Sequence, residues 1–296
     1  MQFVIGTRGS KLALVQAEYV QERLQERYPE HTFTLKIIKT KGDKIQNKSL
    51  SAIGDKGLFV KEIERELLDG EIQLAVHSMK DMPGEIPEGL CFANAWERED
   101  PRDVLILREA ESLSDLPEHA VIGTGSKRRV CQLLALRPDL TIVDIRGNVD
   151  TRLKKMQEQK LDGIVLAAAG LKRLHMESVI TQYFTPEEMI PAAAQGTLAI
   201  ELRSQDTELL SMVNAFSDDK AQRIAQTERA FLQQIGGDCH MPIGAHATIL
   251  ADGNIRLRAL FGDADGTQIA TCEKVGSDPE VLAADAVLEL QKRLGL

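Results

Sequence analysis

Residues 121–134, VIGTGSKRRVCQLL, place three consecutive cations at the start of an expected helix. A short apolar run ends at a glycine-containing turn, and Lys127, Arg128 and Arg129 come directly before an apolar helical pattern. The N-terminus of a helix carries unpaired N–H groups and a partial positive charge, so it attracts anions. Arginine adds a forked donor that matches a carboxylate or a phosphate. The stretch therefore predicts a site for an anionic group.

Other short apolar runs in the first two-thirds of the chain are also followed by basic residues. One cation after a strand is usually a solvated surface charge, but the repetition favours a common cleft, because ligands of open α/β sheets bind outside the carboxyl ends of the strands. Neither GxxxxGK[ST] nor GxGxxG is present, so a ligand with several carboxylates, or an oxyanion, fits better than a nucleotide. The further basic residues are Arg8, Lys11, Lys80, Arg146, Arg152, Lys172 and Arg173.

One acid and one thiol stand out beside these cations. Asp81, in HSMKDMP, could hold a developing positive charge or shuttle a proton. Its local sequence alone slightly favours a plain turn-forming role. Cys239, in GGDCHMPIG, is either a nucleophile activated by basic surroundings or an inert loop thiol. His240 and His246 lie nearby without a standard ligand spacing, so we expect no metal site.

Composition limits the class of protein. The chain has 296 residues with 36 Lys+Arg against 45 Asp+Glu, and its net charge of −9 argues against broad binding to nucleic acid or membrane surfaces. The N-terminal segment MQFVIGTRGS has no basic leader and no long apolar run, so we expect no signal peptide and a cytoplasmic protein. The longest apolar run, near GIVLAAAGL, is too short to span a bilayer. The four cysteines show no CxxC spacing and are expected to be free thiols.

The first 200 residues alternate short apolar runs with segments of helical period, which predicts an α/β architecture with mainly parallel sheets. One helix is expected from just after Ser10 to Pro29, and another over roughly 58–69 with Gly70 as its stop. Residues 42–57 between them are polar and punctuated by glycine. This long loop is either a lid over a site or an ordinary surface loop without a role in binding.

The pattern changes after about residue 216. An amphipathic segment ends at Gly236-Gly237, and three alternating segments follow with Asp-Gly turns between them. A last helix is expected over roughly 279–294. The sequence therefore predicts a small, separate α+β domain with a three-stranded antiparallel sheet at the C-terminal end.

Taken together, the motifs resemble the porphobilinogen deaminase (hydroxymethylbilane synthase) family of tetrapyrrole biosynthesis. The resemblance implies two domains similar to the halves of a type II periplasmic binding protein, and a third, α+β domain that carries the cysteine. The implied boundaries are 1–97 plus 194–214 for the first domain, 98–193 for the second and 215–296 for the third. The motifs, which cover nearly the whole chain in order, are GTRGSKLALVQA, GDKGLFVKE, AVHSMKDMP, EREDPRD, GTGSKRRVCQL, DIRGNVDTRL, AAAGLKRL, PAAAQGTLAIE and GGDCHMPIG.

The activity implied by the resemblance is that of a transferase of heme and porphyrin biosynthesis. It would condense four porphobilinogen molecules stepwise into the linear tetrapyrrole hydroxymethylbilane, with loss of ammonia at each step. A dipyrromethane cofactor, bound to Cys239 through a thioether, would act as the primer. We expect a monomeric cytoplasmic enzyme without nucleic-acid or membrane partners. The alternative is a non-enzymatic, two-lobed anion or solute-binding protein, which would not explain the domain that carries the cysteine.

The resemblance also implies individual roles. Asp81 would contact pyrrole N–H groups and stabilise the cationic azafulvene-type intermediate formed when ammonia leaves. Gly125 and Ala52 depart from the family pattern, in which Ser and, in some members, Lys stand. Lys56 and Phe59 would belong to the lid-like loop. The implied cofactor-binding residues are Cys239, Lys80, Asp81, Thr124, Ser126, Arg128, Arg129 and Arg152. The implied substrate-binding residues are Arg8, Ser10, Gln16, Arg146, Arg152, Arg173 and Gln195.

Overall fold

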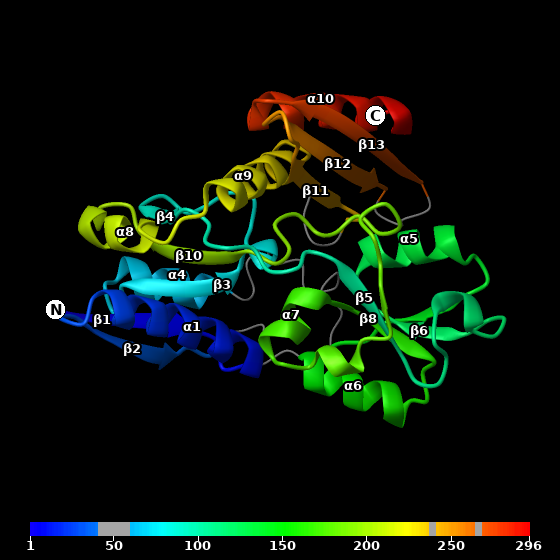
Figure 1. Ribbon diagram of the computed structural model, residues 1–296, viewed down its shortest axis with the longest axis horizontal. Coiled ribbons are helices and arrows are strands. Elements are labelled where there is room, and N and C mark those ends of the chain that lie inside the picture. The colour runs from blue at the N-terminus through cyan, green and yellow to red at the C-terminus, as the bar shows by residue number, and fades with distance from the viewer. Residues whose placement is uncertain (41–59, 237–240, 264–267) are drawn as a thin grey trace. The chain divides into compact units, whose positions relative to one another are not determined.

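The computed structural model describes residues 1–40, 60–236, 241–263 and 268–296. Its contacts divide the chain into two compact units (Figure 1). The first unit contains Met1–Arg98 and Thr197–Gln222, and the second contains Glu99–Gly196 and Arg223–Leu296. The predicted lid-like loop with Lys56 and Phe59, and the predicted attachment residue Cys239, lie outside the described residues.

The first unit is a sheet with helices on both faces. On one face, α1 and α8 cover a core of strand residues such as Ile5 and Leu74, and on the other α4 packs on Ala75. The strands are β1 (Gln2–Thr7), β2 (Thr32–Ile37), β3 (Leu74–Ser78), β4 (Leu90–Phe92) and β10 (Leu198–Arg203). The helices are α1 (Lys11–Arg27), α4 (Lys61–Leu68), the short 3-10 turn η1 (Met79–Asp81) and α8 (Thr207–Asn214).

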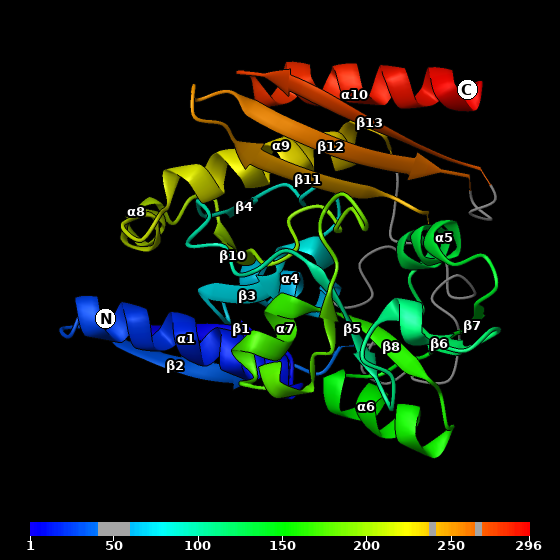
Figure 2. The ribbon, with the colours of Figure 1, turned by 45° about the vertical axis from the view of Figure 1, so that its right-hand side comes forward.

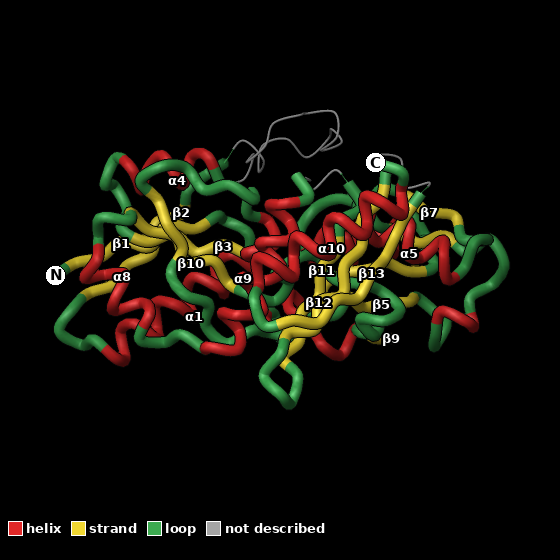
Figure 3. Tube along the Cα trace, turned by 90° about the horizontal axis from the view of Figure 1, so that it is seen from above, coloured by secondary structure: helices red, strands yellow, loops and turns green. Residues whose placement is uncertain are grey.

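The strand order of the first unit is β2-β1-β3-β10-β4. Strands β1, β2 and β3 run parallel, and β10 runs antiparallel to both of its neighbours. Figure 3 shows β1, β2, β3 and β10 of this sheet grouped together. Because Leu198 pairs with Ser78, the amino end of β10 shares an edge of the sheet with the carboxyl end of β3. Residues that follow β1 and β3 are therefore gathered at one edge.

Helix α1 confirms the expectation drawn from its apolar period. Ser10 caps it, because the Ser10 side chain accepts a hydrogen bond from the Ala13 N–H at 3.3 Å. Val20 and Leu24 are fully buried on the face that packs against the sheet. The second expected helix is α4, and Gly70 follows it with a φ of 77°, a conformation that glycine adopts without strain.

The second unit contains another five-stranded sheet and a separate three-stranded sheet. The five-stranded sheet holds β5 (Asp103–Leu107), β6 (Val121–Gly123), β7 (Thr141–Val143), β8 (Gly163–Ala167) and β9 (Gln182–Tyr183). Its helical elements are η2 (Leu113–Asp115), α5 (Lys127–Leu136), α6 (Val149–Glu158), α7 (Ala168–Arg173) and η3 (Glu177–Val179). The last part of the chain contains α9 (Asp219–Gln234), which begins in the first unit and continues into the second, β11 (Gly244–Ile249), β12 (Ile255–Gly262), β13 (Ile269–Gly276) and α10 (Pro279–Leu294).

The order β7-β6-β8-β5-β9 repeats the layout of the first sheet. Strand β6 is parallel to β7 and β8, whereas β5 is antiparallel to β8 and β9. The expectation of mainly parallel sheets was therefore wrong for half of the strand pairs. Strands β5 and β10 each begin within a few residues of a boundary between the units, so no crossover helix precedes them, and a parallel pairing requires such a crossover.

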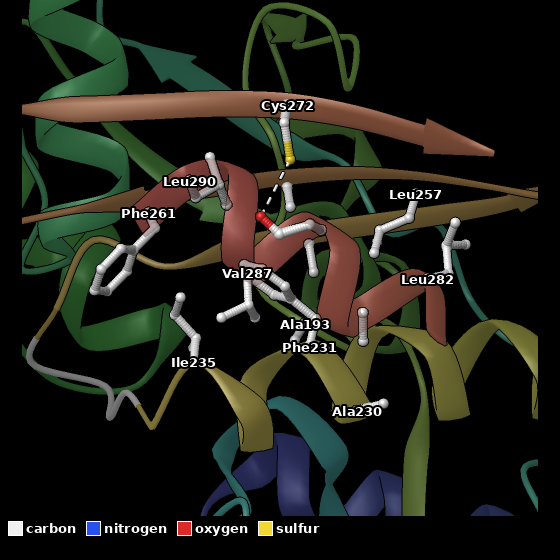
Figure 4. Packing of buried hydrophobic residues seen from close by; sticks show 14 of the residues in the cluster. Ala193, Ala230, Phe231, Ile235, Leu257, Phe261, Cys272, Leu282, Val287 and Leu290 are labelled. Carbon is white, nitrogen blue, oxygen red and sulfur yellow. Dashed lines mark hydrogen bonds between the residues drawn. The ribbon is translucent and has the colours of Figure 1, made fainter. Parts of the chain in front are cut away.

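The C-terminal sheet confirms the antiparallel prediction, with the order β11-β12-β13 (Figure 2). Helices α9 and α10 close its core, in which Phe231 and Leu290 are fully buried (Figure 4). The Cys272 thiol on β13 donates to the Ala286 carbonyl of α10 at 3.7 Å (Figure 4). Asp278 caps α10 by accepting from two backbone N–H groups, so this helix begins where the sequence predicted.

The α/β class and the small antiparallel sheet are thus as predicted. The boundaries proposed for three domains stay a prediction. Across the part of the chain that the structure describes, no helix has the length and apolar character needed to cross a membrane.

Candidate active site

A pocket in the first unit lies where strands β1 and β3 end. Its polar lining comes from residues that follow β1, from α1, and from the end of β3 and the turn η1. Apolar side chains such as Leu12, Val60 and Met82 complete the walls. The polar residues are Arg8, Ser10, Gln16, His77, Ser78 and Asp81. Four of the predicted site residues, Arg8, Ser10, Gln16 and Asp81, are therefore brought together.

Gln16 is fixed in this pocket by Ser78. Its side chain is buried on α1, and its Nε2 donates to Ser78 Oγ at 3.0 Å. The Ser78 hydroxyl lies 3.3 Å from Gln16 Oε1, so the two side chains can hydrogen-bond in either direction. This pair joins α1 to the end of β3 and orients the polar wall of the pocket.

Asp81 closes the turn η1 and is exposed. The turn is held by two backbone hydrogen bonds, from Met79 N–H to the Thr197 carbonyl at 3.0 Å and from Met82 N–H to the Met79 carbonyl at 3.1 Å. The carboxylate is accessible from the pocket and can attract a cationic or N–H-bearing group there. Lys80, which precedes it, is half-buried and is not part of the pocket lining.

A second group of predicted residues surrounds Asp103 in the second unit. Asp103 begins β5 and is fully buried. Arg128 Nη1 donates to its Oδ2 at 2.6 Å, and Arg129 Nη2 and Nε donate to its Oδ1 at 2.7 and 3.1 Å. Gln195 Nε2 donates to Oδ1 at 3.0 Å. Asp103 therefore gathers three residues that the sequence placed in the site.

The charges of this group explain the ionisation of Asp103. Burial raises the pKa of the carboxyl, but the guanidinium groups of Arg128 and Arg129 outweigh burial and hold the pKa well below its usual range. Both arginine side chains are also buried, with 5% and 7% of their surface exposed. Two guanidinium groups share this one carboxylate, which locks α5 against the end of the sheet.

The turn before α5 supplies hydroxyl groups at a helix N-terminus. Thr124 is buried, and its Oγ1 accepts a hydrogen bond from the Ser126 N–H at 3.2 Å. Ser126 occupies the position before the helix, but its side chain makes no capping hydrogen bond. A Cβ atom on Gly125 would lie 2.5 Å from Asp144 Oδ1, so glycine at this position leaves room for the Asp144 side chain.

The remaining predicted arginines are held by carbonyls and by one carboxylate. Arg146 Nε lies 3.1 Å from Asp144 Oδ2, and Arg152 Nε donates to the Gly147 carbonyl at 2.7 Å. Arg146 belongs to the turn between β7 and α6, and Arg152 to α6 itself. Arg173, on α7, donates through Nη2 to the Gly196 carbonyl at 2.7 Å. These contacts orient the side chains at the ends of β7 and β8.

The sequence reasoning missed Asp103 and His77 as members of these groups. Asp103 stands directly before the buried run of β5, and an acid at such a position was the available signal. His77 lies inside the buried, mostly apolar strand LAVHS, where a titratable side chain is unusual. Within the described ranges, no set of three or more His, Cys, Asp or Glu residues could hold a metal ion.

Comparisons with known proteins give one consistent family. The protein-family model described as "Porphobilinogen deaminase, dipyromethane cofactor binding domain" matches residues 3–211. A second family model, "Porphobilinogen deaminase, C-terminal domain", matches residues 223–294. The porphobilinogen deaminase of Lachnospira eligens is 58% identical over 288 residues, which cover 97% of this chain and 98% of the relative. That of Clostridioides difficile is 54% identical over 270 residues, covering 91% of this chain and 89% of the relative.

Among solved structures, the periplasmic VFT2 domain of BvgS from Bordetella pertussis is 14% identical, with a TM-score of 0.44. The match covers 79% of this chain and 92% of that chain. This likeness is too weak to define the fold, which rests on the strand order. The sequence relatives, in contrast, match nearly end to end at high identity. The chain therefore belongs to the porphobilinogen deaminase family.

Proposed function

We propose that this chain is a transferase that condenses four porphobilinogen molecules, with loss of ammonia at each step, into hydroxymethylbilane. The observation that carries this proposal is the match of both family models, which together span almost the whole chain. The relatives at 58% and 54% identity are named porphobilinogen deaminase. The pathway is that of porphyrin and heme biosynthesis.

The pocket of the first unit suits such a substrate. Each porphobilinogen carries an acetate and a propionate, which Arg8 can bind through its guanidinium group, while Ser10 and Gln16 offer hydrogen bonds. Asp81 would accept hydrogen bonds from pyrrole N–H groups and stabilise the positive charge that develops as ammonia leaves. A carboxylate that favours this charged state over the ground state lowers the barrier.

The second unit has the donor set that a dipyrromethane cofactor requires. Hydroxyl groups, backbone N–H groups at the start of α5 and several guanidinium groups are suited to the carboxylates of its rings. When bound, the cofactor supplies the pyrrole α-carbon to which the first porphobilinogen is joined. We propose Cys239 as the thioether attachment. The proposed partners of the cofactor carboxylates, of which all but Lys80 belong to the second unit, are Lys80, Thr124, Ser126, Arg128, Arg129 and Arg152.

Other residues would act on substrate and on the growing chain. We propose that Arg146, Arg152 and Arg173 bind the carboxylates of the substrate and of the growing chain. We also propose that Lys56 and Phe59 belong to a lid-like loop. Gln195 is fully buried and donates to both Asp103 and the Pro101 carbonyl. Its contribution would therefore be made through Asp103, which it holds in place between Arg128 and Arg129.

We also propose a monomeric, cytoplasmic enzyme of three domains, 1–97 plus 194–214, 98–193 and 215–296. The net charge of −9 opposes general nucleic-acid binding. The separate core of the C-terminal sheet supports a third domain, since Phe231, Ile255 and Leu290 are fully buried within it.

Asp81→Ala tests the function. We expect the variant to fold normally and to lose porphobilinogen turnover by about 10²–10³-fold, the cost of removing one electrostatic stabiliser. Porphobilinogen consumption and ammonia release measure the effect, and Glu85→Ala, an exposed acid in the loop that follows, is the matched control. Near wild-type turnover in Asp81→Ala would remove Asp81 from the mechanism. A wild-type protein that binds porphobilinogen without consuming it would instead favour a binding protein.

A further inference from the structure

A buried acid–base pair, His77 and Glu201, includes one residue of the pocket that Asp81 also lines. His77 on β3 lines the pocket and is only 7% exposed. Its Nε2 lies 3.2 Å from Oε2 of Glu201, a residue of β10 whose side chain is fully buried. The register places Glu201 opposite Ala75 and His77 opposite Ala199, so both side chains are on the face of the sheet that α4 covers.

Within the described part of the chain, neither carboxylate oxygen of Glu201 has an aligned hydrogen bond. His77 Nε2 is therefore its charge partner by proximity, although the contact does not meet hydrogen-bond geometry. A buried carboxylate without a counter-charge is strongly disfavoured, and so is a buried cation. One proton held between His77 and Glu201 leaves the pair without net charge, which burial tolerates better than a lone carboxylate or a lone cation.

The surroundings of the pair supply little compensation. Glu64 of α4 is buried, and burial, together with the nearby Glu201 carboxylate and against the pull of Lys61, raises its pKa to about 7. On β4, burial and then the charge of Glu201 raise the pKa of the Cys91 thiol. The charged groups on the pocket side are Arg8 and Asp81. Among these described neighbours, Lys61 at the start of α4 is a cation near Glu64. His77 is the group that can compensate the negative charge of Glu201 directly.

We propose that His77, backed by Glu201, is the proton shuttle of the porphobilinogen site. This inference rests on the proposed function, and it assigns a task that Asp81 does not perform. Asp81 stabilises positive charge on the pyrrole, whereas His77 gives and takes the proton. Among the described residues that line the pocket of the first unit, His77 is the one histidine.

The shuttle balances over one condensation. The C–N bond of the substrate ammonium breaks, and its electron pair leaves with nitrogen as ammonia. His77 in its cationic form donates a proton to that ammonia, which departs as ammonium. The free pyrrole α-carbon of the growing chain then forms the new C–C bond to the substrate carbon that lost ammonia. The C–H electron pair of that α-carbon returns to its pyrrole ring, and neutral His77 accepts the released proton. Glu201 stabilises the cationic form, so the pair ends as it began.

Steady-state kinetics of the holoenzyme over pH 6–10 test the shuttle. His77→Gln should lower kcat by about 10²-fold or more, with a small change in KM, because general acid–base catalysis typically contributes 10²–10⁴-fold. In Glu201→Gln the carboxylate that favours cationic His77 is absent, so kcat should begin to fall at a lower pH than in the wild type. A residue that only supports the fold would not move this alkaline limb. His175→Gln and Glu88→Gln, both at exposed positions, are matched controls.

The double variant His77→Gln/Glu201→Gln separates chemistry from stability. Removing His77 alone leaves Glu201 buried without its partner, so the double variant should be more stable than His77→Gln while remaining equally slow. If wild-type holoenzyme consumes porphobilinogen but His77→Gln keeps kcat within twofold, or the Glu201→Gln pH profile coincides with that of the wild type, the shuttle is refuted. If wild-type holoenzyme consumes no porphobilinogen, the proposed function itself fails.

Discussion

Replacing Asp103 by Asn removes the negative charge at the centre of the second unit and keeps the shape of the side chain. Asp103 is fully buried and accepts four hydrogen bonds, one from Arg128, two from Arg129 and one from Gln195. The asparagine amide group can replace only part of this set, because it brings its own N–H donors towards the guanidinium groups. Two buried guanidinium groups would then lose their shared counter-charge.

The expected loss is about 3–5 kcal/mol of the free energy of unfolding, which is typical when one partner of a buried ion pair is removed. This exceeds the value of an exposed ion pair because solvent cannot replace the lost partner. The Asp139→Asn variant is the matched control. Asp139 pairs with Arg137 near the surface and is partly exposed, so its loss should cost much less.

Urea unfolding followed by far-UV circular dichroism measures the loss for the whole chain. The single tryptophan, Trp96, lies in the core of the first unit, so its fluorescence reports on that unit separately. The pKa of Asp103 is depressed in the folded protein, and its stabilising contribution is therefore present above the unfolded value, about 3.9. The difference between wild type and Asp103→Asn should stay constant above about pH 5 and shrink as the pH falls below about 4.

Two results would refute this account of Asp103. One is a loss in Asp103→Asn no larger than that in Asp139→Asn at pH 7. The other is a difference between wild type and Asp103→Asn that grows as the pH falls from 5 to 3. Either would mean that Arg128 and Arg129 do not depend on the charge of Asp103.

Two further predictions concern packing and thiols. In Gly163→Ala the new Cβ would lie 2.6 Å from Leu107 Cδ2 and 2.8 Å from the backbone oxygen of Ile106. We therefore expect the variant to be destabilised by about 1–3 kcal/mol, measured by thermal unfolding. Unchanged stability would contradict the tight approach of β8 to β5. Burial raises the pKa of both Cys131 and Cys272 to about 11, so iodoacetamide at pH 8 should label them only after unfolding. Peptide mass spectrometry measures this labelling, and rapid modification of either thiol in the folded protein would contradict its burial.

Local signals in the sequence were sufficient to predict several elements. The Ser10 cap and the apolar period predicted α1, and the residues from Asp278 to Gly295 contain the start and stop signals of α10. The antiparallel direction of β5 and β10 could not be predicted in the same way. An apolar run carries no sign of strand direction, which here depends on where the chain crosses between the units.

The cations of the predicted site carry a recognisable sequence signal, whereas the buried acids beside them do not. Arg128 and Arg129 follow a strand in a recognisable pattern, but Asp103 is 25 residues from Arg128 in sequence and meets it only through the sheet. His77 and Glu201 are likewise brought together by the pairing of β3 with β10. Long-range partners of this kind leave only a weak sign in one sequence, namely a charged or polar residue within a buried strand.

The intact mass of the denatured protein, measured beside a Cys239→Ser variant, tests the central claim most directly. The account predicts that the wild type carries an excess equal to two joined pyrrole units and that the variant carries none. The same wild-type sample should consume porphobilinogen. An unmodified wild type that leaves porphobilinogen unchanged would contradict the account and would make Cys239 an ordinary thiol.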